Sequence, residues 1–487
     1  MPEVLKIPRC MSTQHPDNVT IPFFAENTEL GGEDEIQEAY YAFSILGCDE
    51  QMWDCEGKEI DNFVVKKLLT KYEPFFRERI LGKDVFLTLR VPNPTIEKSE
   101  AKILLETLES IPRSFDAAKL FYRKDIAPIF EVILPMTASS KCINRVYGYY
   151  SDFVVGKQNA LFKDGVTIAD WIGEFKPEKI NVIPLFEDMP HMLNADKIVR
   201  EYLKDKNLKY QRVFLARSDP AMNYGLISAV LLNKIALHRL HDAENDIGIR
   251  IFPIIGVGSA PFRGNLNPKN IENVLGEYPY THTFTIQSAF KYDYSPNDVR
   301  KAMENIQLAQ IIEQEGIDEE KSLDIIERYS QEYQKQVIYL ADIINKVARY
   351  VPSRRKRKLH IGLFGYSREV EKVKLPRAIT FTAALYSLGL PPELIGLNAL
   401  SGSDFDFLRK NYNSFDSDIR DALSYYNPNS LKFLGLSEDM IKIPVKCETN
   451  QSHKELTDII IDSLEKNNVE ILDENILRAA HIRKFLG

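Results

Sequence analysis

The stretch Ile183-Pro-Leu-Phe-Glu-Asp188 ends an apolar run with two acids, and Arg217-Ser-Asp-Pro-Ala-Met-Asn223 ends the next such run with a third. Both runs, residues 180–187 and 212–217, are short and apolar, which is typical of strands buried in a parallel sheet. Residues 225–241 then follow with the apolar spacing of a helix. A strand followed by a helix is the repeating unit of a parallel α/β fold.

The same strand–helix unit recurs along the chain, and the number of these units predicts the fold. Eight strand-like runs, with helix-period segments between them, favour a closed (β/α)8 barrel, the TIM-like fold of the α/β class. We expect one barrel domain with helical insertions over residues 1–487, and a helical extension over residues 391–487 packed on the barrel. Helices are expected at residues 98–110, 225–241, 296–314 and 322–347. Strands are expected at residues 4–13, 85–90, 126–134, 180–187, 212–217, 249–256, 281–287 and 359–366.

Composition argues against several classes of function. A net charge of −8 and a pI near 5.7 argue against a nucleic-acid partner. No apolar run approaches the roughly 20 residues that cross a bilayer, and the N-terminus lacks the apolar core of a signal peptide, so no membrane partner is expected. The five cysteines are scattered without a C-x-x-C pair, which indicates free thiols in a reducing cytoplasm.

Polar groups stand near the ends of nearly all the expected strands. Barrel enzymes build their active site at the carboxyl ends of the strands, so we expect these groups to surround one mouth. They are His15, Arg90, Glu131, Glu187, Asp219, Arg263 within a glycine-rich loop, Gln287 and Arg368.

Glu187 and Asp219 are the candidate metal ligands. Two carboxylates from neighbouring strand ends, with positions left for water and substrate oxygens, suit Mg²⁺ or Mn²⁺. The alternative is that Asp188 and Asp219 cap the helices that follow, since Asp219 precedes a proline, a common way to open a helix. Spacing alone leaves both interpretations open.

Two arginines are candidate phosphate contacts. Arg90 ends the apolar strand Phe86-Leu-Thr-Leu-Arg90, where a cation needs an anionic partner, either an internal carboxylate or a phosphate. Arg263 lies in Gly256-Val-Gly-Ser-Ala-Pro-Phe-Arg-Gly264, whose glycines would let the backbone approach a ligand while the arginine fork grips phosphate. This loop is also a candidate lid. The basic run Arg354-Arg-Lys-Arg-Lys358 is interpreted as a solvated turn.

His15 follows the first expected strand, in the string Met11-Ser-Thr-Gln-His-Pro-Asp-Asn18. Because a proline cannot extend a strand interior, the strand should stop there and the histidine should face what lies beyond the sheet. A histidine titrates near neutrality and can transfer a proton under working conditions. A structural, hydrogen-bonded histidine is the alternative from the residues alone.

This octapeptide resembles the signature of archaeal-type phosphoenolpyruvate carboxylases. The resemblance runs over nearly the whole chain, including Thr285-Ile-Gln-Ser-Ala-Phe-Lys-Tyr-Asp293 and Leu363-Phe-Gly-Tyr-Ser-Arg368. The larger bacterial and plant relatives carry Thr-Ala-His-Pro-Thr-Glu, Pro-Leu-Phe-Glu-Thr, Tyr-Ser-Asp-Ser-Ala-Lys and a doubled Gly-Arg-Gly-Gly at the matching places. Matched residue by residue, the resemblance implies catalytic roles for His15 and Arg263, metal ligation by Glu187 and Asp219, and phosphate contact by Arg90 and Arg263. Asp188 matches a non-ligand and is expected to be a cap.

The chain departs from the larger enzymes at two cationic positions. Val257 stands where they carry the first arginine of the doubled motif, and Met222 stands where they carry a lysine. Arg217, Lys291 and Arg368 lie near strand ends and are the candidate substitutes for these cations. The other expected substrate-binding residues are Gln287, Gly256 and Gly258.

The implied activity is anaplerotic carbon fixation: phosphoenolpyruvate and bicarbonate give oxaloacetate and phosphate, through carboxyphosphate and an enolate. The resemblance also implies Mg²⁺ or Mn²⁺ and, because the relatives are tetramers, a homotetramer. One alternative is a different metal-dependent barrel enzyme of phosphoenolpyruvate or an oxo acid, a lyase or kinase, which would use the same acids without needing the His15 string. A non-catalytic interaction protein is the other, and it leaves the strand-end polar residues unexplained.

Overall fold

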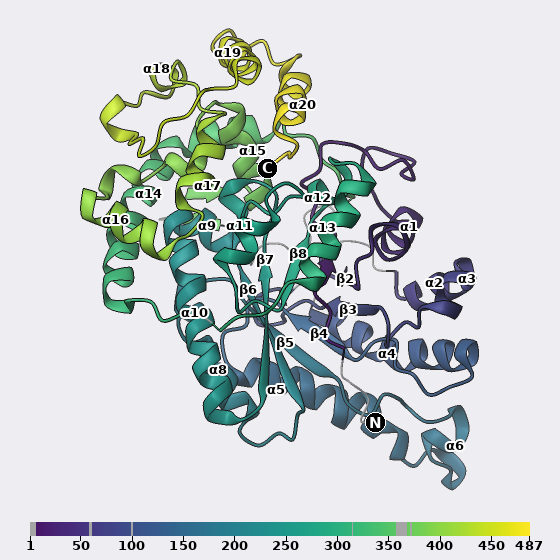
Figure 1. The fold of residues 1–487 in the computed structure, drawn as a ribbon. Coiled ribbons are helices and arrows are strands. Elements are labelled where there is room, and N and C mark those ends of the chain that lie inside the picture. Colours follow the sequence, from purple (N-terminus) through teal and green to yellow (C-terminus); the bar gives the residue numbers. More distant parts are fainter. Residues whose placement is uncertain (1–5, 58–60, 99–100, 314, 357–367, 371–372) are drawn as a thin grey trace.

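Eight parallel strands close into a barrel with helices around it (Figure 1). The computed structural model describes residues 6–57, 61–98, 101–313, 315–356, 368–370 and 373–487. Each strand pairs in parallel with the next, and the last pairs with the first, with Met11 opposite Thr285. The strands are β1 (Cys10–Ser12), β2 (Glu50–Asp54), β3 (Phe86–Arg90), β4 (Glu131–Leu134), β5 (Asn181–Phe186), β6 (Tyr210–Ala216), β7 (Arg250–Gly256) and β8 (Thr283–Ile286).

The expected fold class is confirmed, but one of the eight expected strands is replaced by another. Seven of the expected runs overlap a barrel strand, whereas β2 was not expected. Its sequence, Glu50-Gln-Met-Trp-Asp54, has no apolar run because its inward positions at both ends are acidic. The remaining expected strand, residues 359–366, lies outside the described residues, and the barrel closes without it.

Helices occupy most of the chain between and after the strands. The four helices expected from periodicity correspond to α4, α10, α13 and α14 below. The helices of the barrel region are α1 (Glu33–Tyr41), α2 (Val64–Lys71), α3 (Glu73–Glu78), α4 (Ala101–Tyr122), α5 (Ser140–Gly148), α6 (Ile168–Ile172), α7 (Met189–Met192), α8 (Ala195–Leu203), α9 (Ser218–Tyr224), α10 (Leu226–Ile247), α11 (Ile271–Glu277), α12 (Ser288–Tyr292) and α13 (Pro296–Leu308). Those that follow are α14 (Glu319–Ala348), α15 (Ala378–Ser387), α16 (Gly402–Asn411), α17 (Phe415–Leu423), α18 (Ser430–Leu434), α19 (Gln451–Glu465) and α20 (Leu472–Arg483).

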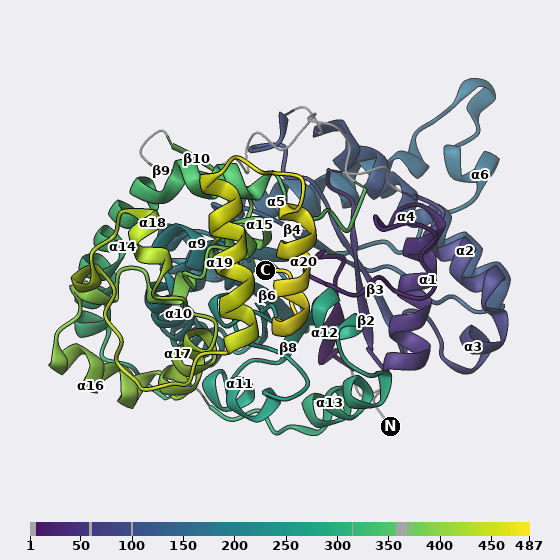
Figure 2. The same cartoon turned by 90° about the horizontal axis from the view of Figure 1, so that it is seen from above.

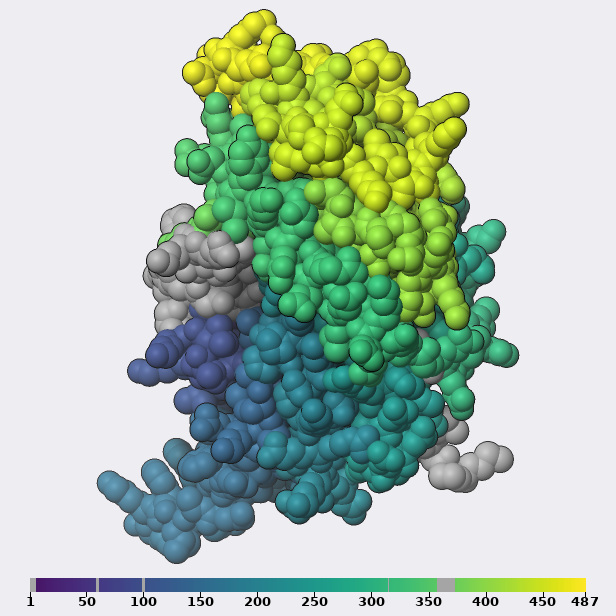
Figure 3. Space-filling view, turned by 90° about the vertical axis from the view of Figure 1, so that its left-hand side faces the viewer, coloured from purple at the N-terminus to yellow at the C-terminus, as the bar shows by residue number. Residues whose placement is uncertain are grey.

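The C-terminal helices gather at one end of the molecule. Figure 2 looks down on them and shows α19, α20 and the chain end in front of the barrel. In Figure 3 they form the yellow-green top, while the blue segment around α6 projects from the opposite end. In the described part of the chain no single helix is long and apolar enough to cross a membrane; α15 and residues 392–399 pass that test only together, as a pair bent by 91°.

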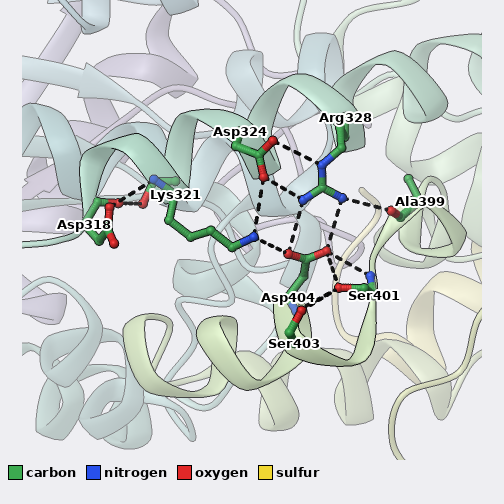
Figure 4. A network of polar contacts seen from close by, with 9 residues as sticks. Asp318, Lys321, Asp324, Arg328, Ala399, Ser401, Ser403 and Asp404 are labelled. Atoms are coloured by element: carbon green, nitrogen blue, oxygen red, sulfur yellow. Dashed lines mark hydrogen bonds and ion pairs between the residues drawn. The ribbon is translucent and has the colours of Figure 1, made fainter.

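A polar network joins α16 to α14 (Figure 4). Asp404 forms a capping box with Ser401 at the start of α16 and accepts hydrogen bonds from Arg328 at 3.1 and 3.2 Å. Lys321, which precedes Arg328 on α14, pairs with the same carboxylate at 2.9 Å. Burial raises the pKa of Asp404, but the hydrogen bonds from Arg328 and Lys321 outweigh it and the net pKa is lowered. The charged carboxylate therefore ties the C-terminal helices to a long helix that packs on the barrel.

The barrel interior is layered, because successive side chains of a strand point to opposite faces. At the amino ends of the strands, Arg212 bridges Glu50 at 2.7 Å and Glu131 at 2.9 Å, and all three are buried. Above them lies an apolar layer of Met11, Met52, Ile133, Ile183, Leu185, Phe214, Ala216 and Ile254. Two positions further along their strands, inward side chains reach the carboxyl end of the barrel.

Glu131 was expected at the mouth, and this expectation is wrong. Glu131 is the first residue of β4, so it points into the barrel at the amino end and pairs with Arg212. Burial raises its pKa, and Arg212 opposes this effect. Glu131 therefore belongs to the charged layer at the amino end of the barrel, whereas the active site of a barrel enzyme lies at the other end.

Arg212→Met should destabilise the protein by about 3–5 kcal/mol, because it leaves two buried carboxylates without their cation. Arg200→Met is the matched control: Arg200 pairs with the exposed Asp246 at 2.8 Å on the surface, where such pairs contribute little. Denaturant unfolding of both variants measures the difference. Equal losses would contradict the assignment of Arg212 to a buried network.

Candidate active site

A cavity of about 300 Å³ opens at the carboxyl ends of the barrel strands. Its floor is the apolar layer of the barrel, including Met52, Leu185 and Phe214, and residues of α15 and the chain end, such as Ala378 and Leu486, contribute to its walls. Eight of the residues expected from sequence line it together. They are His15, Arg90, Glu187, Arg217, Asp219, Gly256, Arg263 and Gln287.

The two candidate metal ligands lie at neighbouring strand ends. Glu187 directly follows β5 and accepts a hydrogen bond from the Met136 backbone amide at 2.6 Å. Asp219 is the second residue of α9, just beyond β6. Asp188, by contrast, caps α7 by accepting from the His191 amide at 2.9 Å, as expected.

These carboxylates fit a divalent cation that shares its ligands with substrate. Among the described residues no group of three or more His, Cys, Asp or Glu side chains is arranged to hold a metal by itself. Two carboxylates beside an open cavity would leave the remaining positions to water and substrate oxygens. Mg²⁺ is commonly bound in this way with phosphorylated substrates.

Arg90 forms the internal salt bridge that its sequence position allowed, and it also lies in the cavity wall, so contact with a phosphate stays a prediction. Its guanidinium makes a two-point ion pair with Asp54, at 3.1 and 2.8 Å, and lies 3.5 Å from Glu56. It also lines the cavity with 6% of its surface exposed. The internal salt bridge therefore fixes the cation where it faces the cavity. Its partner Asp54 was missed because β2 was missed.

Arg263 is held by contacts from distant parts of the chain. Its Nη1 lies 3.1 Å from an Asp17 oxygen, and its Nε donates to the Ser218 hydroxyl at 3.2 Å. Further hydrogen bonds reach Gln287 and the Gly487 carbonyl. Burial lowers the pKa of the Arg263 guanidinium, and Asp17 opposes the effect. Asp17 belongs to the His15 octapeptide, and sequence reasoning gave it no role.

The glycine-rich loop, the candidate lid, is buried and hydrogen-bonded to itself. The Gly258 amide donates to the Arg263 carbonyl at 2.8 Å, and Leu266 donates back to Gly258 at 2.9 Å. A Cβ on Gly258 would lie 2.9 Å from the Arg263 guanidinium carbon, so only glycine lets this cation pack so closely on the backbone. Residues 257–265 are all buried. The loop therefore forms a packed wall of the cavity, and its role as a lid stays a prediction.

The candidate substitutes for the missing cations differ in position. Val257 and Met222 are fully buried. Arg217 lines the cavity and donates to the Tyr278 hydroxyl and the Phe262 carbonyl, both at 3.2 Å. These contacts hold a second buried cation beside Arg263.

Two other candidates are not part of the described cavity wall. Lys291 lies outside the cavity lining, and its Nζ pairs with Glu38 at 2.9 Å and donates to the Thr13 carbonyl at 2.9 Å. Arg368 begins β9 (Arg368–Val370), which pairs with β10 (Val373–Leu375) outside the barrel. The Arg368 side chain lies outside the described residues.

The basic run was expected to be solvated, and this is wrong for its first two residues. Arg354 and Arg355 are 4% and 2% exposed and line the cavity, as does Arg377. Arg355 pairs with Glu35 and Glu38 of α1, each at 2.8 Å. These acids lie more than 300 residues earlier in the sequence, so the run itself carried no sign of burial.

His15 lies beyond the end of β1 and is half-buried in the cavity wall. Its Nδ1 is 3.0 Å from the Thr13 hydroxyl, which orients the ring. Its backbone carbonyl accepts from the Asp17 and Ser288 amides, so the turn that carries it is bonded to α12. The expected catalytic histidine is therefore in the same cavity as the acids and arginines.

Together these features define a barrel enzyme that acts on a small anion, with carboxylates suited to a divalent cation beside it. Residues 7–487 match the family model described as phosphoenolpyruvate carboxylase, and the chain belongs to this family. The enzyme is accordingly a carboxy-lyase, which decides against the kinase and interaction-protein alternatives.

Several phosphoenolpyruvate carboxylases match this chain over their full length. The phosphoenolpyruvate carboxylase of Methanothermobacter thermautotrophicus is 60% identical over 99% of this chain and 100% of its own. Those of Methanospirillum hungatei and Pyrococcus abyssi are 56% and 51% identical with the same coverage.

Arg263→Lys should lower kcat/KM for phosphoenolpyruvate by at least about tenfold, or roughly 1.4 kcal/mol. Lysine keeps the charge but cannot reach Asp17, Ser218 and Gln287 at once as the planar fork does. Steady-state kinetics check this, with the surface variant Arg200→Lys as control. Unchanged kinetics would mean that Arg263 supplies no more than charge.

Proposed function

We propose roles for the cavity residues in the family reaction, in which phosphoenolpyruvate and bicarbonate give oxaloacetate and phosphate. The observation that carries the proposal is the meeting of His15, Glu187, Asp219 and the arginines around one cavity. Glu187 and Asp219 hold a divalent cation, Mg²⁺ or Mn²⁺. Such a cation supplies a Lewis acid for the enolate oxygen and a template for the substrate.

Arg90 and Arg263 hold the phosphoryl group while bicarbonate attacks it. Such transfers depend on positioning and charge stabilisation, which pre-paired arginines supply without reorganising. Gln287 and the backbone at Gly256 complete this wall, whereas Gly258 is not among the cavity-lining residues and contributes by letting Arg263 pack against the backbone. Arg217, together with Arg354 and Arg377, supplies the positive charge that Val257 and Met222 do not. Lys291 acts through its ion pair with Glu38, and a contact by Arg368 stays a prediction.

Attack by bicarbonate yields carboxyphosphate and the enolate of pyruvate. His15 then removes the carboxyl proton of carboxyphosphate, which releases carbon dioxide and phosphate beside the enolate. The enolate carbon attacks carbon dioxide to form oxaloacetate. The apolar floor of Met52, Leu185 and Phe214 limits the water that would protonate the enolate to pyruvate.

The proposed setting is a homotetramer in the cytoplasm. The tetramer follows from the family resemblance, and the five free thiols suit a reducing compartment. Size-exclusion chromatography with light scattering tests the assembly, with four copies of the 56.0-kDa chain as the expected mass.

Asp219→Asn and Glu187→Gln should each lower kcat by more than about tenfold and weaken Mn²⁺ binding by a similar or larger factor, since each removes a charged ligand. Titration calorimetry with Mn²⁺ gives a readout apart from activity. Asp188→Asn is the matched control, because Asp188 caps α7 beside the same strand end. Affinity and turnover within about threefold of the parent in both ligand variants would remove the metal assignment.

His15→Asn should change the products and not simply abolish turnover. The phosphate wall and the metal acids remain, so carboxyphosphate and enolate can still form. Without the base, decarboxylation slows and the enolate picks up a proton instead.

The variant should therefore release phosphate and pyruvate in a bicarbonate-dependent way and make little oxaloacetate. Phosphate, pyruvate and oxaloacetate are measured together, with and without bicarbonate. A normal oxaloacetate yield would exclude His15 from the mechanism, and loss of phosphate release would move it to the first step.

A further inference from the structure

We infer that Asp418, on α17 of the C-terminal helices, is a positioning residue for the phosphate-binding wall: through Asn265 it holds the loop that carries Arg263. The inference rests on the proposed role of Arg263 in holding the phosphoryl group. Asp418 itself is not among the residues that line the cavity, so it acts only through the loop.

The Asn265 side chain connects the end of this loop to α17. Asn265 lies two residues after Arg263, is 3% exposed and has a φ of 56°, a conformation that asparagine tolerates better than most residues. Its side-chain amide donates to Asp418 Oδ1 at 2.7 Å and to Asp421 Oδ2 at 2.9 Å. Its backbone carbonyl accepts from the Asn270 side chain at 2.9 Å. The side chain of Asn265 is thus held by α17 and its backbone by Asn270.

Both oxygens of Asp418 are engaged by buried donors. Oδ1 accepts from Asn265, and Oδ2 accepts from the Tyr412 hydroxyl at 2.5 Å. Asp418 is only 5% exposed. Burial raises its pKa to about 7, while the hydrogen bonds from Tyr412 and Asn265 favour the charged form. With each of its oxygens bonded to a different donor, the carboxyl group is held in place, and with it the amide of Asn265.

The same loop connects the two buried cations of the wall. Arg217 donates to the carbonyl of Phe262, the neighbour of Arg263 in the loop. Burial lowers the pKa of Arg217, but Tyr278, Tyr412 and the charge of Asp418 raise it, and the net pKa is above its usual value. Arg217 and Asp418 are therefore close enough to interact. A displaced loop would therefore move Arg263 and remove a contact of Arg217 at the same time.

Asp421 provides an internal comparison. It accepts from the same amide of Asn265, but from the exposed side of α17, where water can replace it. The buried Asp418 has no such replacement, because an unpaired buried donor costs the full desolvation penalty. The two carboxylates accept from the same amide but differ in burial. Comparing their variants therefore shows whether the buried acid positions the loop or whether any acid at this amide has the same effect.

The test compares Asp418→Ala with Asp418→Asn and Asp421→Ala. Asp418→Ala should raise the KM for phosphoenolpyruvate and the inhibition constant of inorganic phosphate by at least about tenfold, with circular dichroism confirming the fold. Asp418→Asn keeps an acceptor for Asn265 and a polar partner for Tyr412, so it should recover most of the loss. Asp421→Ala should stay within about twofold of the parent. A merely structural role would lower the thermal midpoint and leave both constants unchanged.

Asn265→Gly reaches the same contact from the loop side and keeps the positive φ, so it covers the case in which Asp418→Ala does not fold. It should reproduce the rise in both constants. Parent-like constants in Asn265→Gly, or equal effects of Asp418→Ala and Asp421→Ala, would overturn the inference. If Arg263→Lys instead leaves kinetics unchanged while Asn265→Gly raises both constants, the proposed role of Arg263 fails and the anchoring of the loop stands.

Discussion

Side chains alternate between the two faces of a strand, and in a closed barrel one of those faces is enclosed. Along β2 this places Glu50, Met52 and Asp54 inward in turn. A single strand therefore contributes to the charged layer at the amino end, to the apolar layer above it and to the ion pair that holds Arg90 at the cavity. Phe214 and Ala216 above Arg212 on β6 follow the same rule. The chemistry of the site therefore depends on a register in which a shift by one residue would turn its side chains outward.

This register explains how much the sequence could reveal. Apolar runs predicted seven barrel strands, and six of the polar residues expected at strand ends line the cavity, together with Arg217 and Gly256, which were also expected there. β2 was missed because its inward positions are acidic, and that strand carries the partner of Arg90. The burial of Arg355 and the position of Lys291 were missed for a related reason, since both depend on Glu38 of α1, which no local pattern links to them.

The cations of the cavity share one arrangement: carboxylates from another element hold several of them in place. Asp54 holds Arg90, Asp17 holds Arg263, and Glu35 and Glu38 hold Arg355. Such pairs stabilise a buried charge that would otherwise be costly, and they also fix its direction. A polyanionic substrate therefore meets cations that are already oriented, and the buried glycine-rich loop carries one of them, Arg263.

The contacts that complete the wall span most of the chain. Arg263 and Asp17 are 246 residues apart, and Arg355 and Glu38 are 317 apart. Contacts of this separation carry the largest loop-closure cost and form slowly, after local helices. During refolding, helical content should consequently return before the cavity is assembled, so recovered turnover reports the last long-range closure of the chain and not the formation of its secondary structure.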